Sequence, residues 1–282
     1  MIQDADVDAL AALLNEGFAG RKLAFWQAGL ARLASRPLPE GTPRYGYCLD
    51  AGGKLVGVLL LIASHRPRNG MAQPFTNVAS WYVQENFRAY AQLLVSMALK
   101  SKTTTYFNVS AAPHTWPIVE KQGYRMYCAG LYFAFAVLAP KRPGVEIIDI
   151  NTSPDHAILG TMNDGELLRR HADLGCRVLV CRTGGEATGF VFRRLAARAG
   201  RLKLPAMMVL YASGYNRLQS LAGNLGRYLL PEAAPILIFD AMGKVPGIPG
   251  LFTDRRGRKF AKGPHTPELC ALADTELAIF GI

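Results

Sequence analysis

The sequence lacks a long hydrophobic run. Its longest apolar stretch, Leu55 to Ala63, has only the length of a strand, whereas a helix that spans a bilayer needs about 20 apolar residues in succession. The N-terminus also lacks a basic segment followed by an apolar one, which is the pattern of a secretory signal peptide. We therefore expect a soluble, cytoplasmic protein with no membrane span.

Paired cysteines and common catalytic motifs are also missing. The five cysteines form no CxxC pair and have no spacing typical of Cys/His metal ligands. This pattern predicts free thiols in a reducing compartment and no metal site. The sequence has no GxSxG, P-loop, HExxH or dinucleotide-binding motif, so nothing points to the hydrolases, NTPases, metalloproteases and dehydrogenases that use them.

Charged residues are scarce, but the charge is one-sided. Only 19% of the residues are charged, yet the net charge is +11, which attracts anionic ligands of many kinds. The one dense basic run lies within Gly247–Lys262, a segment that we expect to be a loop. It consists of Arg255, Arg256, Arg258, Lys259 and Lys262. Such a run can hold an anionic small molecule, contact nucleic-acid phosphates, or be only a solvated loop; no zinc-finger or RRM signature accompanies it.

Hydrophobic periodicity and turn residues divide the first half of the chain into a clear order of elements. Two amphipathic helices are expected first, starting at Val7 and Leu23. The expected strands and later helices then follow in the order strand 45–49, strand 55–64, strand 76–83, helix 86–100, strand 104–110, helix 118–122 and strand 126–138.

The second half repeats this order at a constant shift. The Gly52-Gly53 turn matches Gly184-Gly185, 132 residues later. Gly57, in the strand after the first turn, matches Gly189 at the same shift. The same shift carries strand 76–83 onto 208–215 and strand 104–110 onto 236–242. The pattern predicts a tandem repeat of one α/β (α+β) unit with mixed sheets flanked by helices. A Pro-rich linker at 139–144 separates a first domain, 1–139, from a second, 145–282.

Two motifs of the first half resemble those of the GNAT (Gcn5-related N-acetyltransferase) superfamily. Glu120-Lys121-Gln122-Gly123-Tyr124 is similar to the EKLGF ending of that family, and Val83 followed by Arg88 is similar to its strand-to-helix junction. The resemblance covers about residues 1–138, with a weaker echo over 155–243. It implies two GNAT-like domains in tandem and transfer of an acetyl or other acyl group from acyl-CoA to an amine or hydroxyl acceptor.

The resemblance also implies where acyl-CoA would bind. At the family's junction a pyrophosphate meets the first N–H groups of a helix. The matching residues here are Val83, Arg88, Ala89, Tyr90, Ala91 and Gln92. The corresponding segment of the second half offers Ser220, Gly223 and Asn224 as an alternative cofactor site, although Gly223 equally suits close helix packing. The family's Asn and Tyr before the last strands are replaced by Ala112 and Val119.

Two residues are candidate proton carriers. His114 precedes the short helix 118–122, near the expected end of the CoA thiol, and an imidazole there can act as an acid or a base. Glu85 follows the strand that ends at Val83, where it can accept a proton from an amine or simply stabilise the start of a helix. Two alternatives to an enzyme stay open. One is a GNAT-fold binding protein without catalysis, and the other is an anion or nucleic-acid binder that uses the 255–262 run.

Overall fold

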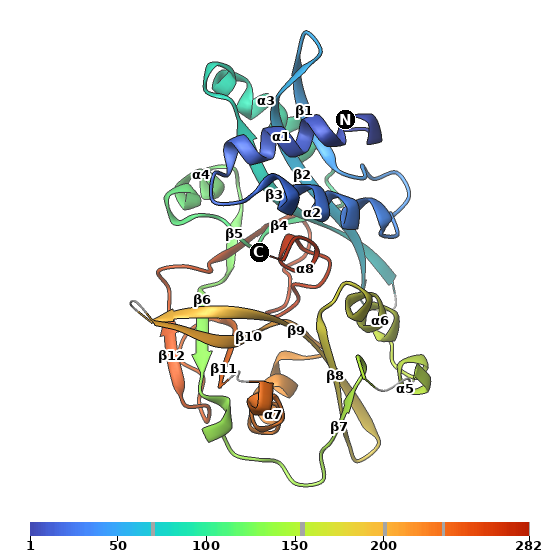
Figure 1. The fold of residues 1–282 in the computed structure, drawn as a ribbon, viewed down its shortest axis with the longest axis vertical. Helices are drawn as coiled ribbons and strands as arrows, with labels where there is room; N and C mark the ends of the chain where they lie inside the picture. The colour runs from blue at the N-terminus through green and yellow to red at the C-terminus, as the bar shows by residue number, and fades with distance from the viewer. Residues whose placement is uncertain (69–70, 153–155, 200–201, 233–234, 282) are drawn as a thin grey trace.

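The computed structural model describes residues 1–282 except 69–70, 153–155, 200–201, 233–234 and 282. The elements form two mixed sheets, one above the other along the long axis of the molecule (Figure 1). The C-terminal segment lies between the halves, beside α8 (Figure 1). Within the described residues, no helix is long and apolar enough to cross a membrane, and no group of three or more His, Cys, Asp or Glu side chains is arranged to hold a metal ion.

The first sheet has six strands in the order β1-β2-β3-β4-β13-β5. Strands β1, β2 and β3 are antiparallel neighbours, β3 and β4 are parallel, and β13 is antiparallel to both β4 and β5. The strands are β1 (Gly46–Ala51), β2 (Lys54–Arg68), β3 (Met71–Val83), β4 (Thr105–Asn108), β5 (Arg125–Cys128) and β13 (Lys259–Lys262).

The second sheet has seven strands in the order β12-β6-β11-β10-β9-β8-β7. Only β10 and β11 are parallel neighbours; the other pairs are antiparallel. The strands are β6 (Gly130–Ala134), β7 (Glu146–Asp149), β8 (Arg177–Thr183), β9 (Glu186–Ala199), β10 (Leu202–Ala212), β11 (Ile236–Ala241) and β12 (Gly250–Thr253).

Helices cover both faces of the sheets because the central strands are apolar on both faces. Along β2, Leu60 and Ile62 pack under α1 and α2, while Leu59 and Leu61 pack against α3. The α-helices are α1 (Val7–Gly17), α2 (Leu23–Ser35), α3 (Ala91–Ala98), α4 (Trp116–Lys121), α5 (His156–Gly160), α6 (Gly165–Asp173), α7 (Tyr215–Leu229) and α8 (Glu276–Ile279). The 3₁₀ helices are η1 (Asp4–Asp6), η2 (Glu85–Tyr90), η3 (Pro113–Thr115), η4 (Ala136–Leu138) and η5 (Leu230–Glu232).

The predicted internal match is present in the two sheets. Shifting β1 to β4 by 132 residues places each strand over β8 to β11, in the same order and with the same pairing directions. The shift also carries α3 onto the second part of α7. The fold class predicted from the sequence, two mixed α/β units in tandem, is confirmed.

The two halves exchange a strand. After β5 the chain leaves the first sheet and enters the second as β6, between β12 and β11; β13 returns from the second half and lies between β4 and β5. The expected single strand 126–138 is therefore wrong, because it breaks at Ala129 and ends in η4. The expected loop 247–262 is also wrong, since its strands β12 and β13 pair with partners more than 100 residues away. The domain limits 1–139 and 145–282 stay a prediction, and sheet membership crosses them at these two strands.

A buried ion pair joins the exchanged strand to the second sheet. Lys259 of β13 lies 2.7 Å from Asp240 of β11, and both side chains are almost completely buried. Burial would lower the pKa of the Lys259 ammonium, but the attraction of Asp240 outweighs this effect and raises it. Lys259 is therefore part of the interior and not of a basic surface.

Candidate functional site

In the first half, β3 separates from β4 partway along its length. The two strands pair in parallel from Phe75 to Asn77 of β3, whereas β3 continues to Val83. A bulge between Ala79 and Tyr82 turns the strand, and Ser80 takes a left-handed conformation there (φ 45°). Among the described residues, no backbone group pairs with β3 on its β4 side beyond Asn77. We call this divergence the first splay.

The second half has the same divergence, but the chain itself fills it. Strands β10 and β11 pair only from Ala206 to Met208 of β10, and a bulge follows between Val209 and Tyr211. The segment 270–272 pairs with the freed edge of β10. Ala212 N–H donates to Cys270 O (3.2 Å), and Leu272 N–H donates to Leu210 O (2.7 Å). Asp240 holds this segment by accepting the Cys270 N–H (3.2 Å). We call this the second splay.

A buried carboxyl group lies beside the first splay. Ser110, which follows β4, donates its hydroxyl to Glu276 Oε1 at 2.5 Å, and Ser110 itself is exposed. The Glu276 N–H donates to Asn77 Oδ1 (3.0 Å), and the Asn77 amide donates to Phe107 O (3.2 Å). Burial raises the pKa of Glu276 to about 7, although the Ser110 hydrogen bond acts against the rise. A carboxyl group with this pKa can both take up and return a proton at neutral pH.

The predicted cofactor residues of the first half lie just beyond this splay. Val83 is buried at the end of β3, and η2 starts two residues later. The first residues of the expected helix 86–100 are therefore 3₁₀, and its second part is the α-helix α3. Arg88 and Glu85 form an ion pair at 3.6 Å and are both largely exposed. Ala89, Tyr90 and Gln92 are exposed and Ala91 is half-buried. The structure thus brings Glu85 and Arg88 together, and the roles assigned to them stay predictions.

Two residues of the basic run contact the short helix α4 and its end, directly after His114. His114 is exposed on η3, directly before α4. The Arg258 guanidinium stacks over the Trp116 ring at 4.3 Å, and Lys262 donates to Gln122 O at 2.7 Å. Because Lys259 is buried, the run is not a continuous exposed basic surface. The catalytic role of His114 stays a prediction.

The alternative cofactor residues of the second half are engaged in packing. A Cβ atom on Gly223 would lie 2.1 Å from Pro140 O. Asn224 accepts the Arg142 N–H (2.9 Å) and donates to Arg142 O (3.0 Å). Ser220 bonds back to Arg217 O within α7. These contacts favour the close-packing alternative for Gly223 over the cofactor site, which stays a prediction.

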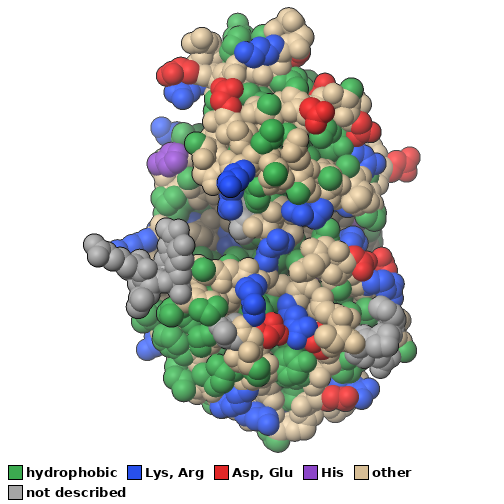
Figure 2. Space-filling view, viewed as in Figure 1, with side chains coloured by type: hydrophobic (Ala, Val, Ile, Leu, Met, Phe, Trp, Pro, Cys, Tyr) green, Lys and Arg blue, Asp and Glu red, His purple; other side chains and the backbone are tan. Residues whose placement is uncertain are grey.

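Three adjoining cavities lie at the junction of the two halves. Their volumes are about 330, 310 and 510 Å³, and Arg170 and Asp274 line all three. The first also contacts Tyr211 and Asp164, and the other two contact Arg36. Cavities of this size are typical of small-molecule sites. In Figure 2 several Lys and Arg side chains lie across this junction on the face shown.

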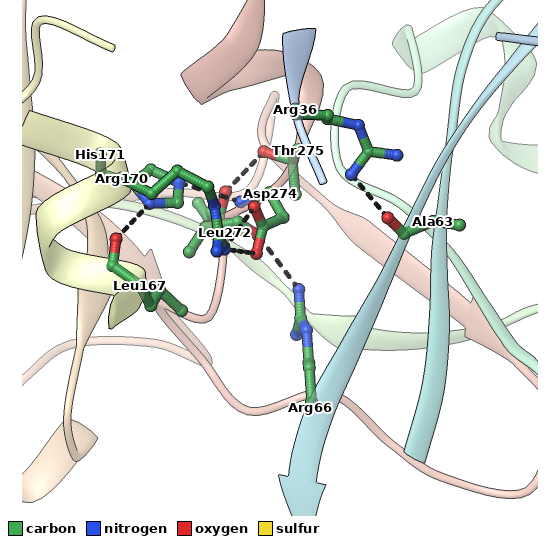
Figure 3. A network of polar contacts seen from close by, with 10 residues as sticks. Arg36, Ala63, Arg66, Leu167, Arg170, His171, Leu272, Asp274 and Thr275 are labelled. Atoms are coloured by element: carbon green, nitrogen blue, oxygen red, sulfur yellow. Dashed lines mark hydrogen bonds and ion pairs between the residues drawn. The ribbon is translucent and has the colours of Figure 1, made fainter. Parts of the chain in front are cut away.

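Asp274 is the centre of a polar network at these cavities (Figure 3). Arg170 of α6 donates to both its carboxylate oxygens, at 2.9 and 2.8 Å. The backbone N–H of Asp274 donates to His171 Nε2 (3.1 Å), and His171 Nδ1 lies 2.8 Å from Leu167 O. This pattern needs a neutral imidazole with its proton on Nδ1, and burial also lowers the pKa of His171. Burial would raise the pKa of Asp274, but the neighbouring positive charges lower it.

Sequence reasoning missed Ser110, Glu276 and the network around Asp274. Glu276 meets its partners Ser110 and Asn77 across 166 and 199 residues. Neither local spacing nor a family motif marks such a pair, because the C-terminal segment reaches the first half only in the folded chain. The internal repeat is the sequence feature that could have located this region, because it places the two splays at equivalent positions. It does not predict which splay the chain fills.

Comparison with known proteins identifies the fold. No protein-family model matches the chain, and no curated protein sequence matches it. Among solved structures, it is similar to a GCN5-related N-acetyltransferase from Anabaena variabilis (TM-score 0.59, 9% identity, 92% of this chain and 70% of the other). It is also similar to a conserved protein of unknown function, a probable N-acyltransferase, from Enterococcus faecalis (0.58, 12%, 97% and 72%).

The chain is also similar to a third solved structure. Eis1 from Mycobacterium abscessus has a TM-score of 0.54 at 11% identity, over 96% of this chain and 73% of the other. At such identities the likeness establishes the fold and nothing finer. Together with the two matching sheets, these comparisons show that the chain has the fold of the GCN5-related N-acetyltransferases, in a tandem arrangement.

Proposed function

We propose that the chain is an acyl-CoA-dependent acyltransferase and that acyl-CoA binds at the first splay. The observation that carries the proposal is the difference between the splays. The edge of β10 is satisfied by segment 270–272, whereas the edge of β3 beyond Asn77 has no backbone partner in the described chain. An extended ligand that carries amide groups can pair with such an edge as an added strand does. The pantetheine arm of CoA is a ligand of this kind.

The residues beyond the splay fit the other end of CoA. The first turn of η2 presents N–H groups at the end of β3, and Arg88 lies in the last turn of the same short helix with its guanidinium exposed. Such an arrangement favours phosphate groups. Arg88 can exchange its weak, solvent-exposed partner Glu85 for a phosphate at little cost.

Ser110 and Glu276 supply a route for protons. In acyl transfer the acceptor nitrogen forms a bond to the thioester carbon, the carbon–sulfur bond breaks, and the amine proton must leave. Ser110 is exposed and bonded to the buried carboxylate of Glu276. It can therefore take the amine proton while passing its own to Glu276, and the same pair can return a proton to the departing thiolate. This route replaces the Tyr that the family carries where Val119 stands.

The acceptor is an amine or hydroxyl compound in this proposal, and the acyl group is acetyl or longer. A cytoplasmic location is part of the proposal, because acyl-CoA is made inside cells and the five cysteines are free thiols. A binding protein without catalysis is the alternative that the same splay supports.

Calorimetry with acetyl-CoA on matched variants tests the proposal. We expect wild-type binding in the micromolar range, about tenfold weaker in Arg88→Ala because a charged phosphate contact is lost. Arg217→Ala is the control, since Arg217 lies in the first turn of α7 and pairs with Glu186 at the equivalent place of the second half. Loss of affinity in Arg217→Ala alone would move the site to the second half, and a lack of binding to any acyl-CoA would refute the proposal.

A further inference from the structure

One of the three junction cavities is surrounded by an excess of positive charge. It has a volume of about 310 Å³ and is lined by residues of four separate segments, among them Arg36, Ser64, His65, Arg170 and Asp274. Arg66, which lines the adjoining cavity of about 330 Å³, donates to Ala273 O (3.3 Å; Figure 3). The lining of this cavity thus includes two arginines, Arg36 and Arg170, and one carboxylate, Asp274. The Asp274 carboxylate is ion-paired with Arg170, and no ion pair joins it to Arg36 within the described residues.

Arg36 is the arginine of this cavity with the fewest contacts among the described residues. The residue is only 9% exposed, and within the described part of the chain it makes one hydrogen bond, from Nη1 to Ala63 O (2.6 Å). Its Nε and Nη2 atoms have no hydrogen-bond partner among the residues that the structure describes. The Asp274 carboxylate acts on Arg36 only from a distance, and burial lowers the pKa of Arg36 to about 10. A buried guanidinium whose one bonded acceptor is neutral is an unfavourable arrangement, which an anionic group bonded to Nε and Nη2 would relieve.

A second orphaned group lies beside it. Ser64, next to the carbonyl that Arg36 bonds, is 7% exposed, and its hydroxyl has no hydrogen-bond partner in the described part of the chain. Both residues line the same cavity. The Nε and Nη2 atoms form one edge of the guanidinium plane, which matches the two oxygens of a carboxylate or phosphate group.

We propose that this cavity binds a small organic anion, with a carboxylate or phosphate group held by Arg36 and Ser64. In this proposal the Arg36 side chain turns its Nε–Nη2 edge into the cavity, and the bond to Ala63 O is the described hydrogen bond that holds it. The segment 37–39, Pro-Leu-Pro, contributes apolar side chains to the cavity lining, so the ligand carries a short apolar body beside its anionic group. The site differs from the first splay, and it stands whether or not the chain transfers acyl groups.

The test is a titration of the full chain with three probes at equal ionic strength: inorganic phosphate, acetate and chloride. The readouts are the Nε–H signal of Arg36 in ¹⁵N NMR spectra and the melting temperature. We expect phosphate or acetate to shift the Arg36 signal with a Kd of about 1–10 mM and to raise the melting temperature, while chloride does neither. A response to acetate alone assigns a carboxylate ligand, and a response to phosphate alone assigns a phosphorylated one.

Variants separate the site from general charge effects. Arg36→Lys keeps the charge but lacks the paired donors, so it should bind the probe about tenfold more weakly, and Ser64→Ala about threefold more weakly. Arg255→Lys, on an exposed arginine of the basic run, is the matched control and should bind as the wild type does. Equal responses to all three probes, no response to any, or unchanged binding by a folded Arg36→Lys variant would each overturn the proposal.

Discussion

The two halves of this chain share one strand order and have a splay at the same place, but the second splay is filled by the chain and the first is not. In the second half, segment 270–272 occupies the splay between β10 and β11 and is held there by backbone hydrogen bonds and by Asp240. In the first half, β3 has no backbone partner on its β4 side beyond Asn77 among the described residues, and the buried carboxyl of Glu276 lies beside this edge. A repeat therefore need not imply two equal sites.

Of the changes predicted here, separating the two halves should have the largest effect on folding. Residues 1–139 alone lack β13, so β5 loses the strand that joins it to β4. We expect this fragment to be unfolded or aggregated when expressed alone, because a sheet missing an interior strand leaves backbone groups unpaired. Circular dichroism and thermal unfolding provide the measurement. Co-expression with residues 140–282 is the control and should restore folded protein; a fragment that folds alone would contradict the importance of the exchange.

Asp240→Asn tests the filled splay. The change leaves Lys259 charged and buried without its partner and weakens the hold on Cys270. We expect the free energy of unfolding to fall by about 3–5 kcal/mol, as for other broken buried ion pairs. Chemical denaturation measures the loss. The surface pair of Arg182 and Glu146 offers the control, since Glu146→Gln should cost less than about 1 kcal/mol; a similar loss in both variants would contradict the account.

Glu276→Gln is the matching test at the open splay. The folded-state pKa of Glu276, about 7, lies above the value of 4.5 for the free group, so folding favours the protonated form. The stability from this group is fully present below about pH 4.5 and is lost as the pH rises to about 7. The total is about 3 kcal/mol, because each pKa unit corresponds to about 1.4 kcal/mol.

Glutamine cannot ionise, so Glu276→Gln should be more stable than the wild type at pH 8 and similar to it at pH 4.5. Denaturation curves at the two pH values measure this difference. If the difference in unfolding free energy between the wild type and the variant is the same at both pH values, Glu276 does not have the raised pKa.

Ser80→Gly should have the smallest effect. Ser80 adopts a left-handed backbone at the bulge that turns β3 from β4, and glycine adopts this conformation without the steric cost that serine has. We expect a gain or loss of no more than about 1 kcal/mol, because the relief is offset by the greater freedom of glycine in the unfolded chain. Ser80→Val should destabilise the protein by about 1–3 kcal/mol. If valine is tolerated as well as glycine, the bulge does not impose the conformation.

Local patterns in the sequence predicted the elements that depend on neighbouring residues. The apolar spacing after Val7 and Leu23, the Gly-Gly turns and the constant shift of 132 residues placed most helices and strands of both sheets. Strands β6 and β13 could not be assigned to their sheets, because pairing with the other half depends on contacts more than 100 residues away. The filled second splay and the Ser110–Glu276 pair could not be predicted for the same reason, since they too depend on contacts between residues far apart in the sequence.

Hydrogen–deuterium exchange of the full chain, with and without CoA, tests the central claim most directly. The open splay predicts that CoA slows exchange of the amides from Val78 to Val83 and in η2, while the amides from Leu210 to Ala212 and at the start of α7 exchange as before. Protection in the second half without protection in the first would contradict the claim that the free edge of β3 is the cofactor site.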